Sequence, residues 1–364
     1  MTLDQLFDAA AKPKSAPEGS ITIRRPDDWH IHLRDGAMLR AVLPFTAAQF
    51  ARGIIMPNLV PPVTTVAAAE AYRERILAAR PAGNDFRPMM TCYLTDQTSA
   101  DEIEKGHAEG VWIAAKLYPA GATTNSHHGV RDLKALRPVL ERMERIGMPI
   151  LIHGEATDPA VDIFDREAVF MEQSLLPMLR RHAGLKVVVE HVTTAETVDI
   201  VRDHASHAAG TITPHHLVIN RTSLFQGGLR PHLYCLPVAK RERHRLALRK
   251  AVTSGESCFF IGTDTAPHRR NAKEAECCSA GVFGGATALQ TYVQVFDEEG
   301  ALDRFEAFAS VGGAKFYGLE LNRGTITLER REAPVMAAVA VEDTEVVVFR
   351  GGEKLPWSVG EVKP

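Results

Sequence analysis

Short apolar runs alternate with longer segments of helical spacing along most of the chain. The apolar runs are rich in β-branched residues and are bounded by turn residues, which predicts β-strands. Between them, apolar residues that recur every three or four positions predict amphipathic helices. The eight predicted strands lie within 21–32, 51–58, 87–94, 111–118, 148–155, 185–192, 210–217 and 258–264, and the longer predicted helices within 66–80, 133–147, 164–182 and 240–255.

This alternation predicts an α/β protein in which parallel strands are joined by helical crossovers. Eight strand–helix units of about 30 residues each fit a (β/α)8 TIM barrel, which takes about 250 residues. An open, doubly wound sheet is the alternative, although no glycine-rich phosphate loop follows the first predicted strand. We therefore predict a barrel.

The segments on either side of the predicted barrel lack its alternation of apolar runs and helical spacing. Residues 1–19 combine a short amphipathic piece with a Pro/Ser/Gly tether, and we expect a flexible N-terminal extension there. Towards the C-terminus the pattern loosens into two predicted helices, 286–296 and 305–318, and several short strands. We expect residues 20–364 to form a single domain, in which 325–364 is a small C-terminal, β-rich appendage.

Composition narrows the class of protein. The 364 residues carry 42 Lys and Arg against 45 Asp and Glu, and this near balance argues against a nucleic-acid-binding protein. The five cysteines form no CxxC pair and favour a reducing compartment, and the acidic first residues do not resemble a signal peptide. No apolar run reaches about 18 residues, so we expect a cytoplasmic protein with no membrane partner.

Polar residues of chemical interest follow nearly every predicted strand. Histidine is the commonest metal ligand, and the 15 histidines outnumber the 6 tyrosines. In a (β/α)8 barrel, the carboxyl ends of the strands form the rim at which active sites lie. The residues near these strand ends are His30, His32, Asn58, Lys116, His153, His191, His215 and Asp264. The agreement among the strands is stronger evidence than any one residue.

His30 and His32 form an HxH motif at the end of the first predicted strand. Side chains two positions apart in a strand point to the same side, so the two imidazoles can hold one metal ion. A pair of structural histidines is the alternative. His153 and His191 each end another apolar strand, and a lone histidine there is more often a core residue than a ligand. Two of them opposite an HxH motif favour a metal site.

Lys116 lies inside an apolar strand, where burial favours the neutral amine. A neutral amine can capture carbon dioxide, and the resulting carbamate has two oxygens that could bridge two metal ions. A snorkelling or salt-bridged lysine is the alternative, and for a single residue it is the commoner case. Glu155 and Glu190 lie near the histidines in sequence and could orient their imidazoles, or simply belong to ion pairs.

Asp264 ends the last predicted strand, where a carboxylate can bind a metal ion and accept a proton from water. A turn or N-cap aspartate is the alternative. Imidazole and carboxylate ligands without a thiolate favour Zn²⁺ over Mn²⁺ or Co²⁺. Two such ions about 3.5–4 Å apart would support hydrolysis of an amide-like or ester bond.

A series of short motifs extends from about residue 21 to about residue 320. They include RRPDDWHIHLRDG (24–36), MPNLVPPVTT (56–65), AAKLYPAGATTNSHHGV (114–130), FDREAVF (164–170), EHVTT (190–194), GGLRPHLYCLPV (227–238) and GTDTAPH (262–268). Taken together, these motifs resemble the amidohydrolase superfamily and, within it, the shorter bacterial type of the dihydroorotase family. The resemblance covers the predicted barrel but neither terminal segment.

The resemblance implies a role for each residue of the site. Two Zn²⁺ ions per subunit are expected, bridged by a hydroxide and by Lys116 in the form of N6-carboxylysine, and Asp264 is expected to be the catalytic acid–base group. The segment 119–129 resembles a mobile loop that closes over the substrate. The implied zinc ligands are His30, His32, Lys116, His153, His191 and Asp264, and the implied substrate-binding residues are Arg34, Asn58, Thr123, Thr124, Leu236, His268 and Ala280.

The implied reaction is the reversible cyclisation of N-carbamoyl-L-aspartate to L-dihydroorotate in pyrimidine biosynthesis, catalysed by a homodimer. Arg34 suits the substrate's carboxylate because its planar fork can bind two oxygens, although a salt bridge with Asp35 is the alternative. A hydantoinase or an allantoinase would share the metal ligands, so Arg34, Asn58 and the two threonines distinguish the families. A catalytically inactive relative that serves as a scaffold would have lost ligands, and this chain retains all six.

Overall fold

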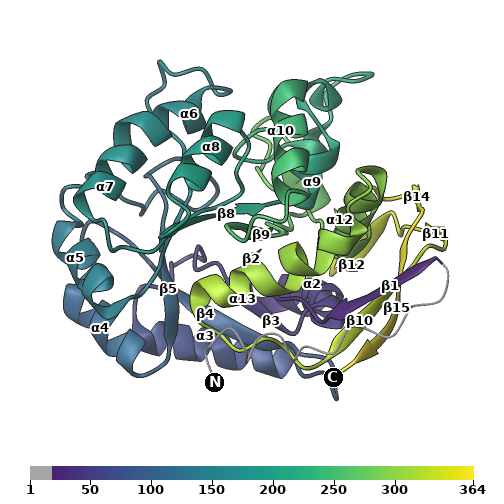
Figure 1. Cartoon of the computed structure of the whole chain (residues 1–364), viewed down its shortest axis with the longest axis horizontal. Coiled ribbons are helices and arrows are strands. Elements are labelled where there is room, and N and C mark those ends of the chain that lie inside the picture. Colours follow the sequence, from purple (N-terminus) through teal and green to yellow (C-terminus); the bar gives the residue numbers. More distant parts are fainter. Residues whose placement is uncertain (1–18) are drawn as a thin grey trace.

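The computed structural model describes residues 19–364, so the extension predicted over 1–19 lies, apart from Gly19, outside the described residues. Eight parallel strands follow one another around a single sheet in chain order (Figure 1). Each lies within one of the predicted apolar runs or overlaps it. They are β2 (Asp28–Ile31), β3 (Arg52–Ile55), β4 (Arg87–Tyr93), β5 (Trp112–Leu117), β6 (Ile150–Ile152), β7 (Val187–Val189), β8 (Ala208–Ile212) and β9 (Phe259–Ile261).

Hydrogen bonds just beyond the last strand close the sheet into a barrel. The backbone N–H of Asp264 donates to the carbonyl of His30 over 3.0 Å, and the N–H of His32 donates to the carbonyl of Thr265 over 3.0 Å. These bonds join the carboxyl ends of β9 and β2, so the sheet has no open doubly wound arrangement. The predicted (β/α)8 TIM barrel is confirmed.

Helices surround the strands on the outside of the barrel (Figure 1). Local chemistry sets their ends: Thr65 caps α3 by accepting from the N–H of Ala68 over 3.2 Å, and Gly147 ends α5 with a positive φ of 72°. The segment predicted as one helix over 164–182 contains a π-helical turn, Met171–Leu175, between α6 and α7. The α-helices are α2 (Gly36–Gln49), α3 (Val66–Ala79), α4 (Ala100–Ala108), α5 (Arg137–Ile146), α6 (Arg166–Phe170), α7 (Leu176–Arg181), α8 (Ala195–Asp203), α9 (Pro214–Val218), α10 (Glu242–Val252), α11 (Arg270–Lys273), α12 (Ala288–Glu298) and α13 (Gly312–Tyr317).

The C-terminal strands include one partner from the other end of the chain. Strand β1 (Ser20–Arg24) pairs antiparallel with β10 (Thr325–Glu329), which also pairs with β15 (Ser358–Lys363). The single strand predicted within 21–32 is therefore two strands, of which β1 belongs to the appendage and β2 to the barrel. The remaining short strands are β11 (Ala333–Pro334), β12 (Ala338–Val341), β13 (Thr344–Val347) and β14 (Lys354–Leu355).

The interior of the barrel is apolar towards the amino ends of its strands. Trp29 stacks on Tyr317 of α13, with ring centroids 4.7 Å apart, and closes this end of the lumen. Buried side chains from successive strands fill the space above it, namely Ile54, Ala114, Leu151, Val188, Ala209 and Phe260. Because this layer excludes polar groups, the functional side chains lie at the carboxyl ends.

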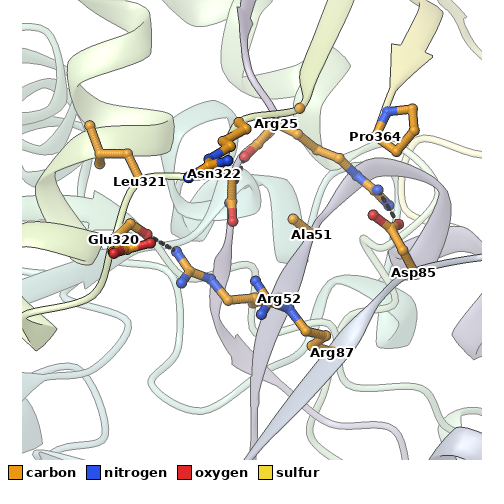
Figure 2. Close-up of a pocket in the computed structure, with 11 residues that line it drawn as sticks. Arg25, Ala51, Arg52, Asp85, Arg87, Glu320, Leu321, Asn322 and Pro364 are labelled. Carbon is orange, nitrogen blue, oxygen red and sulfur yellow. Dashed lines mark hydrogen bonds and ion pairs between the residues drawn. The ribbon is translucent and has the colours of Figure 1, made fainter.

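Charged residues around the amino ends of β2 and β3 form what we call the barrel floor (Figure 2). Nε and Nη2 of Arg52 donate to the two carboxylate oxygens of Asp27 over 2.9 and 2.6 Å. Nη1 of Arg25 donates to Asp85 over 2.5 Å, and its Nη2 donates to the carbonyls of Ala47 and Phe50. The buried charges of the floor are thus matched by charges or carbonyls.

Candidate active site and metal centre

A cavity opens at the carboxyl ends of the barrel strands, where the sequence places the candidate ligands. Eleven of the thirteen predicted site residues line it. Of the other two, Lys116 is fully buried in the barrel, and His268 contacts the cavity-lining residues Arg34 and Ala280. The lining residues are His30, His32, Arg34, Asn58, Tyr118, Thr123, Thr124, His153, His191, Cys235, Leu236, Asp264, Ala266, Ala280 and Gly281.

His30, His32 and Asp264 converge on one point. The Nε2 atoms of the two histidines are 3.2 Å apart, and Oδ1 of Asp264 lies 3.2 Å from the first and 3.1 Å from the second. His30 lies in β2 and His32 directly follows the end of the strand, and the closure of the barrel brings Asp264 against both imidazoles. Three atoms of this kind, each with a lone pair directed at the same space, are a typical face of a metal site.

His153 and His191 form a second such pair at the ends of β6 and β7. Nδ1 of His153 lies 3.1 Å from Nε2 of His191. Nε2 of His153 lies 2.8 Å from Oε2 of Glu155, which is also buried. A carboxylate partner holds the proton on Nε2 and leaves Nδ1 free to bind a metal ion. The suggestion that Glu155 orients an imidazole therefore agrees with the geometry.

Lys116 lies between these two groups and is completely buried. Its Nζ is 3.6 Å from Oε2 of Glu190 and 4.9 Å from the centre of the Tyr118 ring, but it has no hydrogen-bond partner among residues 19–364. Glu190 also lies directly against Nδ1 of His30. A snorkelling lysine is excluded by this burial.

Burial sets the protonation states of the site. Desolvation lowers the pKa of His30 to about 3 and holds the pKa values of His191 and the Lys116 amine well below their ordinary values. Burial opposes ionisation of Asp264 as well, but the neighbouring His30 and His32 hold its pKa well below its usual range. These shifts favour a neutral imidazole at His30 and at His191, a neutral amine at Lys116 and a carboxylate at Asp264, the forms that bind metal ions.

The donor set fits a metal centre. His30, His191 and Asp264 offer ligand atoms that all lie within 4.8 Å of one another, and all three residues are buried. Buried polar atoms normally have partners, yet Nζ of Lys116 and Oε1 of Glu190 have no hydrogen bond to any described residue. A bound cation would compensate for the concentration of lone pairs in this space.

Four of the remaining predicted residues, Arg34, Asn58, His268 and Ala280, form a hydrogen-bonded network around the cavity. Oδ1 of Asn58 lies 2.8 Å from Nδ1 of His32, so this amide holds the imidazole with Nε2 free. Nη2 of Arg34 lies 3.1 Å from Nε2 of His268, which in turn lies 2.9 Å from the carbonyl oxygen of Ala280. Arg34 makes no pair with Asp35, whose carboxylate instead accepts from Arg75 over 3.0 Å.

The segment 119–129 lies over the cavity and is tied to its walls. Oγ1 of Thr124 donates to the carbonyl of Ala280 over 3.1 Å, and the side chain of Asn125 donates to the carbonyl of Asn58 over 2.9 Å. Nδ2 of Asn58 donates to the carbonyl of Thr124 over 3.1 Å. These contacts hold the segment against the walls of the cavity.

Backbone strain is concentrated at the site. Arg34, His191 and Asp264 have positive φ values of 59°, 42° and 45°, a region that side chains other than glycine seldom adopt. Such conformations cost about 1–3 kcal/mol each and persist where the surrounding structure enforces them. All three residues line the cavity and lie two or three positions after the end of a barrel strand.

One predicted strand end is wrong, and one residue was missed. Strand β8 ends at Ile212, and Thr213 caps the short helix α9, so His215 lies on a helix and not at a strand end. Lys273 was not predicted, yet its buried Nζ donates to the carbonyls of Tyr234, Ser279 and Gly281 over 2.7 to 2.8 Å. It clamps together the two loops that bring Leu236 and Ala280 to the cavity. Lys273 ends the short helix α11, and four residues carry no periodic signal that would reveal this role.

Comparisons with known proteins agree with this geometry. The model of the amidohydrolase family matches residues 23–330. A dihydroorotase of Sphingopyxis alaskensis is 60% identical over 337 residues, which are 93% of this chain and 98% of that protein. The crystal structure of a dihydroorotase from Campylobacter jejuni superposes with a TM-score of 0.87 at 32% identity and covers 96% of this chain and 100% of that one.

A more distant neighbour shares the fold alone. The L-hydantoinase of Arthrobacter aurescens has a TM-score of 0.74 but only 17% sequence identity, with 98% of this chain and 93% of that one covered. The chain belongs to the amidohydrolase family and, within it, to the dihydroorotases, hydrolases that act on cyclic amide bonds.

Proposed function

We propose that the cavity catalyses the reversible cyclisation of N-carbamoyl-L-aspartate to L-dihydroorotate, a step of pyrimidine biosynthesis. The observation that carries the proposal is the arrangement of two functions in one cavity. A cluster of metal ligands around Lys116 lies at its base, and the guanidinium of Arg34 lies on its wall beside His268. A cyclic amide with a carboxylate substituent could place its amide carbonyl at the metal ligands and its carboxylate at Arg34.

Two Zn²⁺ ions fit the donor set. His30, His32 and Asp264 would hold one ion, and His153 and His191 the other. When bound, the ions supply Lewis acidity, which lowers the pKa of a water molecule and polarises the reacting carbonyl. The convergence of the ligand contacts described above supports this assignment, as do the lowered pKa values of His30 and His191.

Lys116 as N6-carboxylysine would contribute an oxygen to each ion. The neutral amine attacks carbon dioxide, an N–C bond forms, and the nitrogen releases a proton, which leaves a carbamate with one negative charge. Complete burial of Lys116 supports this chemistry because it removes the charge that would block the attack.

Asp264 is proposed as the acid–base group. In ring opening, its carboxylate takes a proton from the attacking water and delivers it to the ring nitrogen as the C–N bond breaks. Cyclisation reverses the order. The low pKa of Asp264 supports the role of a base that begins the reaction ionised, and its position between His30 and His32 keeps it at the reacting atoms.

The wall of the cavity would bind the substrate. The planar guanidinium of Arg34 can hold both oxygens of the substrate's carboxylate, with His268 and Asn58 beside it. The backbone near Leu236 and Ala280 offers polar groups to the ring. The loop residues Thr123 and Thr124 would exclude water when the segment is closed.

The test is a substrate comparison on the purified protein supplied with zinc and bicarbonate. We expect loss of the dihydroorotate absorbance to be much faster than turnover of hydantoin or allantoin. Preferential turnover of hydantoin would reassign the site to another cyclic amidase. A protein that binds no metal and stays inactive would support the scaffold alternative.

A homodimer is a prediction from the resemblance, and a cytoplasmic location is a prediction from the sequence. Light scattering of the purified protein tests the first, and fractionation of cells tests the second. In the part of the chain that the structure describes, no helix is both long and apolar enough to cross a membrane.

A further inference from the structure

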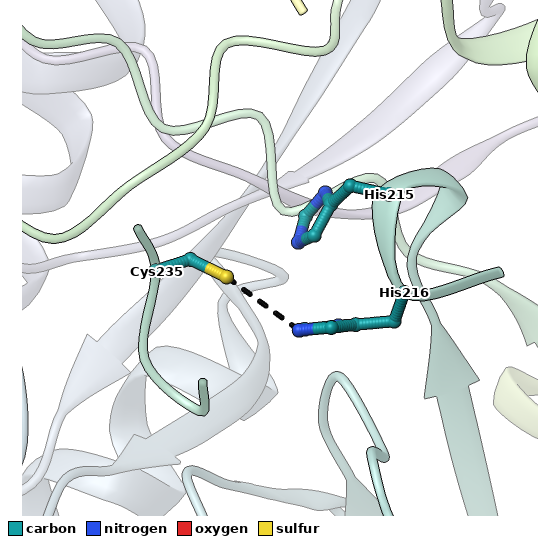
Figure 3. A group of neighbouring side chains, drawn as sticks. All are labelled: His215, His216 and Cys235. Atoms are coloured by element: carbon teal, nitrogen blue, oxygen red, sulfur yellow. Dashed lines mark hydrogen bonds between the residues drawn. The ribbon is translucent and has the colours of Figure 1, made fainter. Parts of the chain in front are cut away.

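A second group of potential metal ligands lies beside the active-site cavity (Figure 3). It consists of His215 and His216 on α9 together with Cys235, and we call it the His215–Cys235 cluster. One ligand atom of each residue lies within 4.8 Å of the other two, and all three side chains are buried. We propose that this cluster is a third metal site, which takes a thiophilic divalent cation such as Zn²⁺.

His215 carries the strongest argument. Its side chain is fully buried, and neither ring nitrogen has a hydrogen-bond partner within the described range 19–364. Protein interiors seldom leave a buried polar group unsatisfied, because its lost hydration is not replaced. Figure 3 shows one of these nitrogens pointing toward the space between Sγ of Cys235 and the ring of His216. A cation in that space would give His215 its missing partner.

His216 can present a lone pair to the same space after a change of tautomer. Its Nε2 lies 3.1 Å from the carbonyl of Pro237 and 3.5 Å from Sγ of Cys235. Its Nδ1 lies 2.8 Å from the hydroxyl of Thr213. A hydroxyl can accept as well as donate, so the proton can move to Nδ1 and leave Nε2 free to bind.

The chemistry of the cluster is that of a zinc site. Two imidazole nitrogens and one sulfur are common zinc ligands and leave a fourth position for water. Burial lowers the pKa of His215 to about 4 and raises the pKa of Cys235 to about 12. The imidazole is therefore neutral at pH 7, and the thiol releases one proton to solvent as the metal–sulfur bond forms. Binding should strengthen as the pH rises.

The cluster is chemically distinct from the catalytic centre, so its test does not depend on the proposed function. None of the six proposed catalytic ligands carries sulfur. Cys235 nevertheless lines the catalytic cavity together with Leu236. A signal from a metal–sulfur bond would therefore report on this cluster alone, provided that the two less buried cysteines are removed.

The experiment starts from protein supplied with only two zinc ions per chain and dialysed, in a Cys277→Ser, Cys278→Ser background, and then adds Co²⁺. We expect one further ion per chain by dialysis and metal analysis, with a near-ultraviolet sulfur-to-cobalt charge-transfer band. Cys235→Ser should remove the band. His215→Gln should weaken cobalt binding by at least about 100-fold, because the loss of an outer partner alone costs about 10–100-fold.

Cys258→Ser is the matched control, because Cys258 is also buried but lies outside the cluster. It should leave the band unchanged. Absence of an additional bound ion in the parent protein, or a band that persists in Cys235→Ser, would overturn the proposal. His216 and Cys235 would then be structural residues that share the carbonyl of Pro237. If Cys235→Ser does not fold, His215→Gln decides alone, since His215 makes no hydrogen bond to a described residue that the change could break.

Discussion

The two ends of the barrel bury polar groups in opposite ways. On the barrel floor, Arg52 and Asp27 meet through two hydrogen bonds, and Arg25 is held by a carboxylate and two carbonyls. At the rim, Nζ of Lys116 and Oε1 of Glu190 have no hydrogen-bond partner anywhere in residues 19–364. Both ends are built on the same strands, so the strands alone do not explain the difference.

The difference separates residues that stabilise the fold from residues that bind a ligand. A satisfied buried pair holds elements together, and breaking it costs stability. A buried set of lone pairs that point at one another is unfavourable until it binds something, which is the property of a ligand site. Variants at the rim should therefore alter chemistry and metal content, whereas variants at the floor should alter the free energy of unfolding.

Asp264→Asn should produce the largest effect. The amide keeps the size of the side chain but cannot accept a proton from water, so kcat should fall by about 10³-fold or more. Substrate binding should be partly retained, because Arg34 and His268 are untouched. Steady-state kinetics and a binding titration measure the two effects. A variant with the parent kcat would exclude Asp264 as the acid–base group.

Lys116→Ala should lose metal along with activity. Without the amine no carbamate can form, so we expect less than two zinc ions per chain and a fall in kcat/KM of at least about 100-fold. Small carboxylic acids should restore part of the activity by taking the place of the carbamate. Lys116→Met fills more of the space and serves as a control that these acids should rescue less. Full zinc content in the alanine variant would contradict the bridging role.

Arg52→Met should act on stability and not on chemistry. It leaves the buried carboxylate of Asp27 without its counter-charge, with only the hydrogen bond from Asn322, which costs about 3–5 kcal/mol of unfolding free energy. Urea unfolding measures the loss, and kcat of the folded fraction should stay unchanged. Lys354→Met removes an exposed ion pair with Glu332 and should leave the urea midpoint nearly unchanged. A large fall in kcat for Arg52→Met would contradict the prediction that residues of the barrel floor affect only stability.

Lys273→Met should weaken substrate binding more than turnover. The change leaves three carbonyls without their donor and loosens the loops at Leu236 and Ala280, so KM should rise about tenfold while kcat changes little. Lys240→Met is the matched control, because its buried Nζ donates only to the carbonyl of Val238 over 2.8 Å. Equal effects of the two variants would show a general cost of losing a buried ammonium.

The contacts of Lys273 should also make KM depend on pH, with a smaller effect than the Lys273→Met substitution. Burial lowers the pKa of Lys273 to about 8, from an ordinary value of 10.5. The clamp is charged below this pH and loses its proton above it, so KM should be constant below about pH 8 and rise a few-fold above it. Lys273→Met should lack this rise. A parent profile that stays flat to high pH would assign the clamp to packing instead of charge.

Much of the fold could be predicted because it depends on local periodicity. Each of the eight barrel strands overlaps a predicted apolar run, since β-branched residues bounded by turns select a strand without distant contacts. The exceptions are places where a distant partner intervenes. The run within 21–32 divides because β1 pairs with β10, some 300 residues away in the chain. His215 joins a helix because Thr213 provides a cap.

The sequence could predict which residues lie at the candidate site but not which of them contact one another. The rule that parallel strands end at one rim brings His30, His153 and Asp264 together before any coordinates are known. The pairing of Asn58 with His32, of Glu155 with His153 and of Glu190 with Lys116 depends on side-chain directions that no pattern encodes. The single-domain organisation of residues 20–364 stays a prediction.

The sequence by itself determined a barrel of eight strands, the set of residues at its rim and the family that this set resembles. These follow from periodicity and from residue types at strand ends, which are local properties of the chain. Only the tertiary structure decided which buried groups are satisfied, as Arg52 is, and which are left without a hydrogen bond to described residues, as Lys116 is. The physical reason is that satisfaction depends on distances of about 3 Å between atoms from separate strands, and closure of the barrel sets those distances.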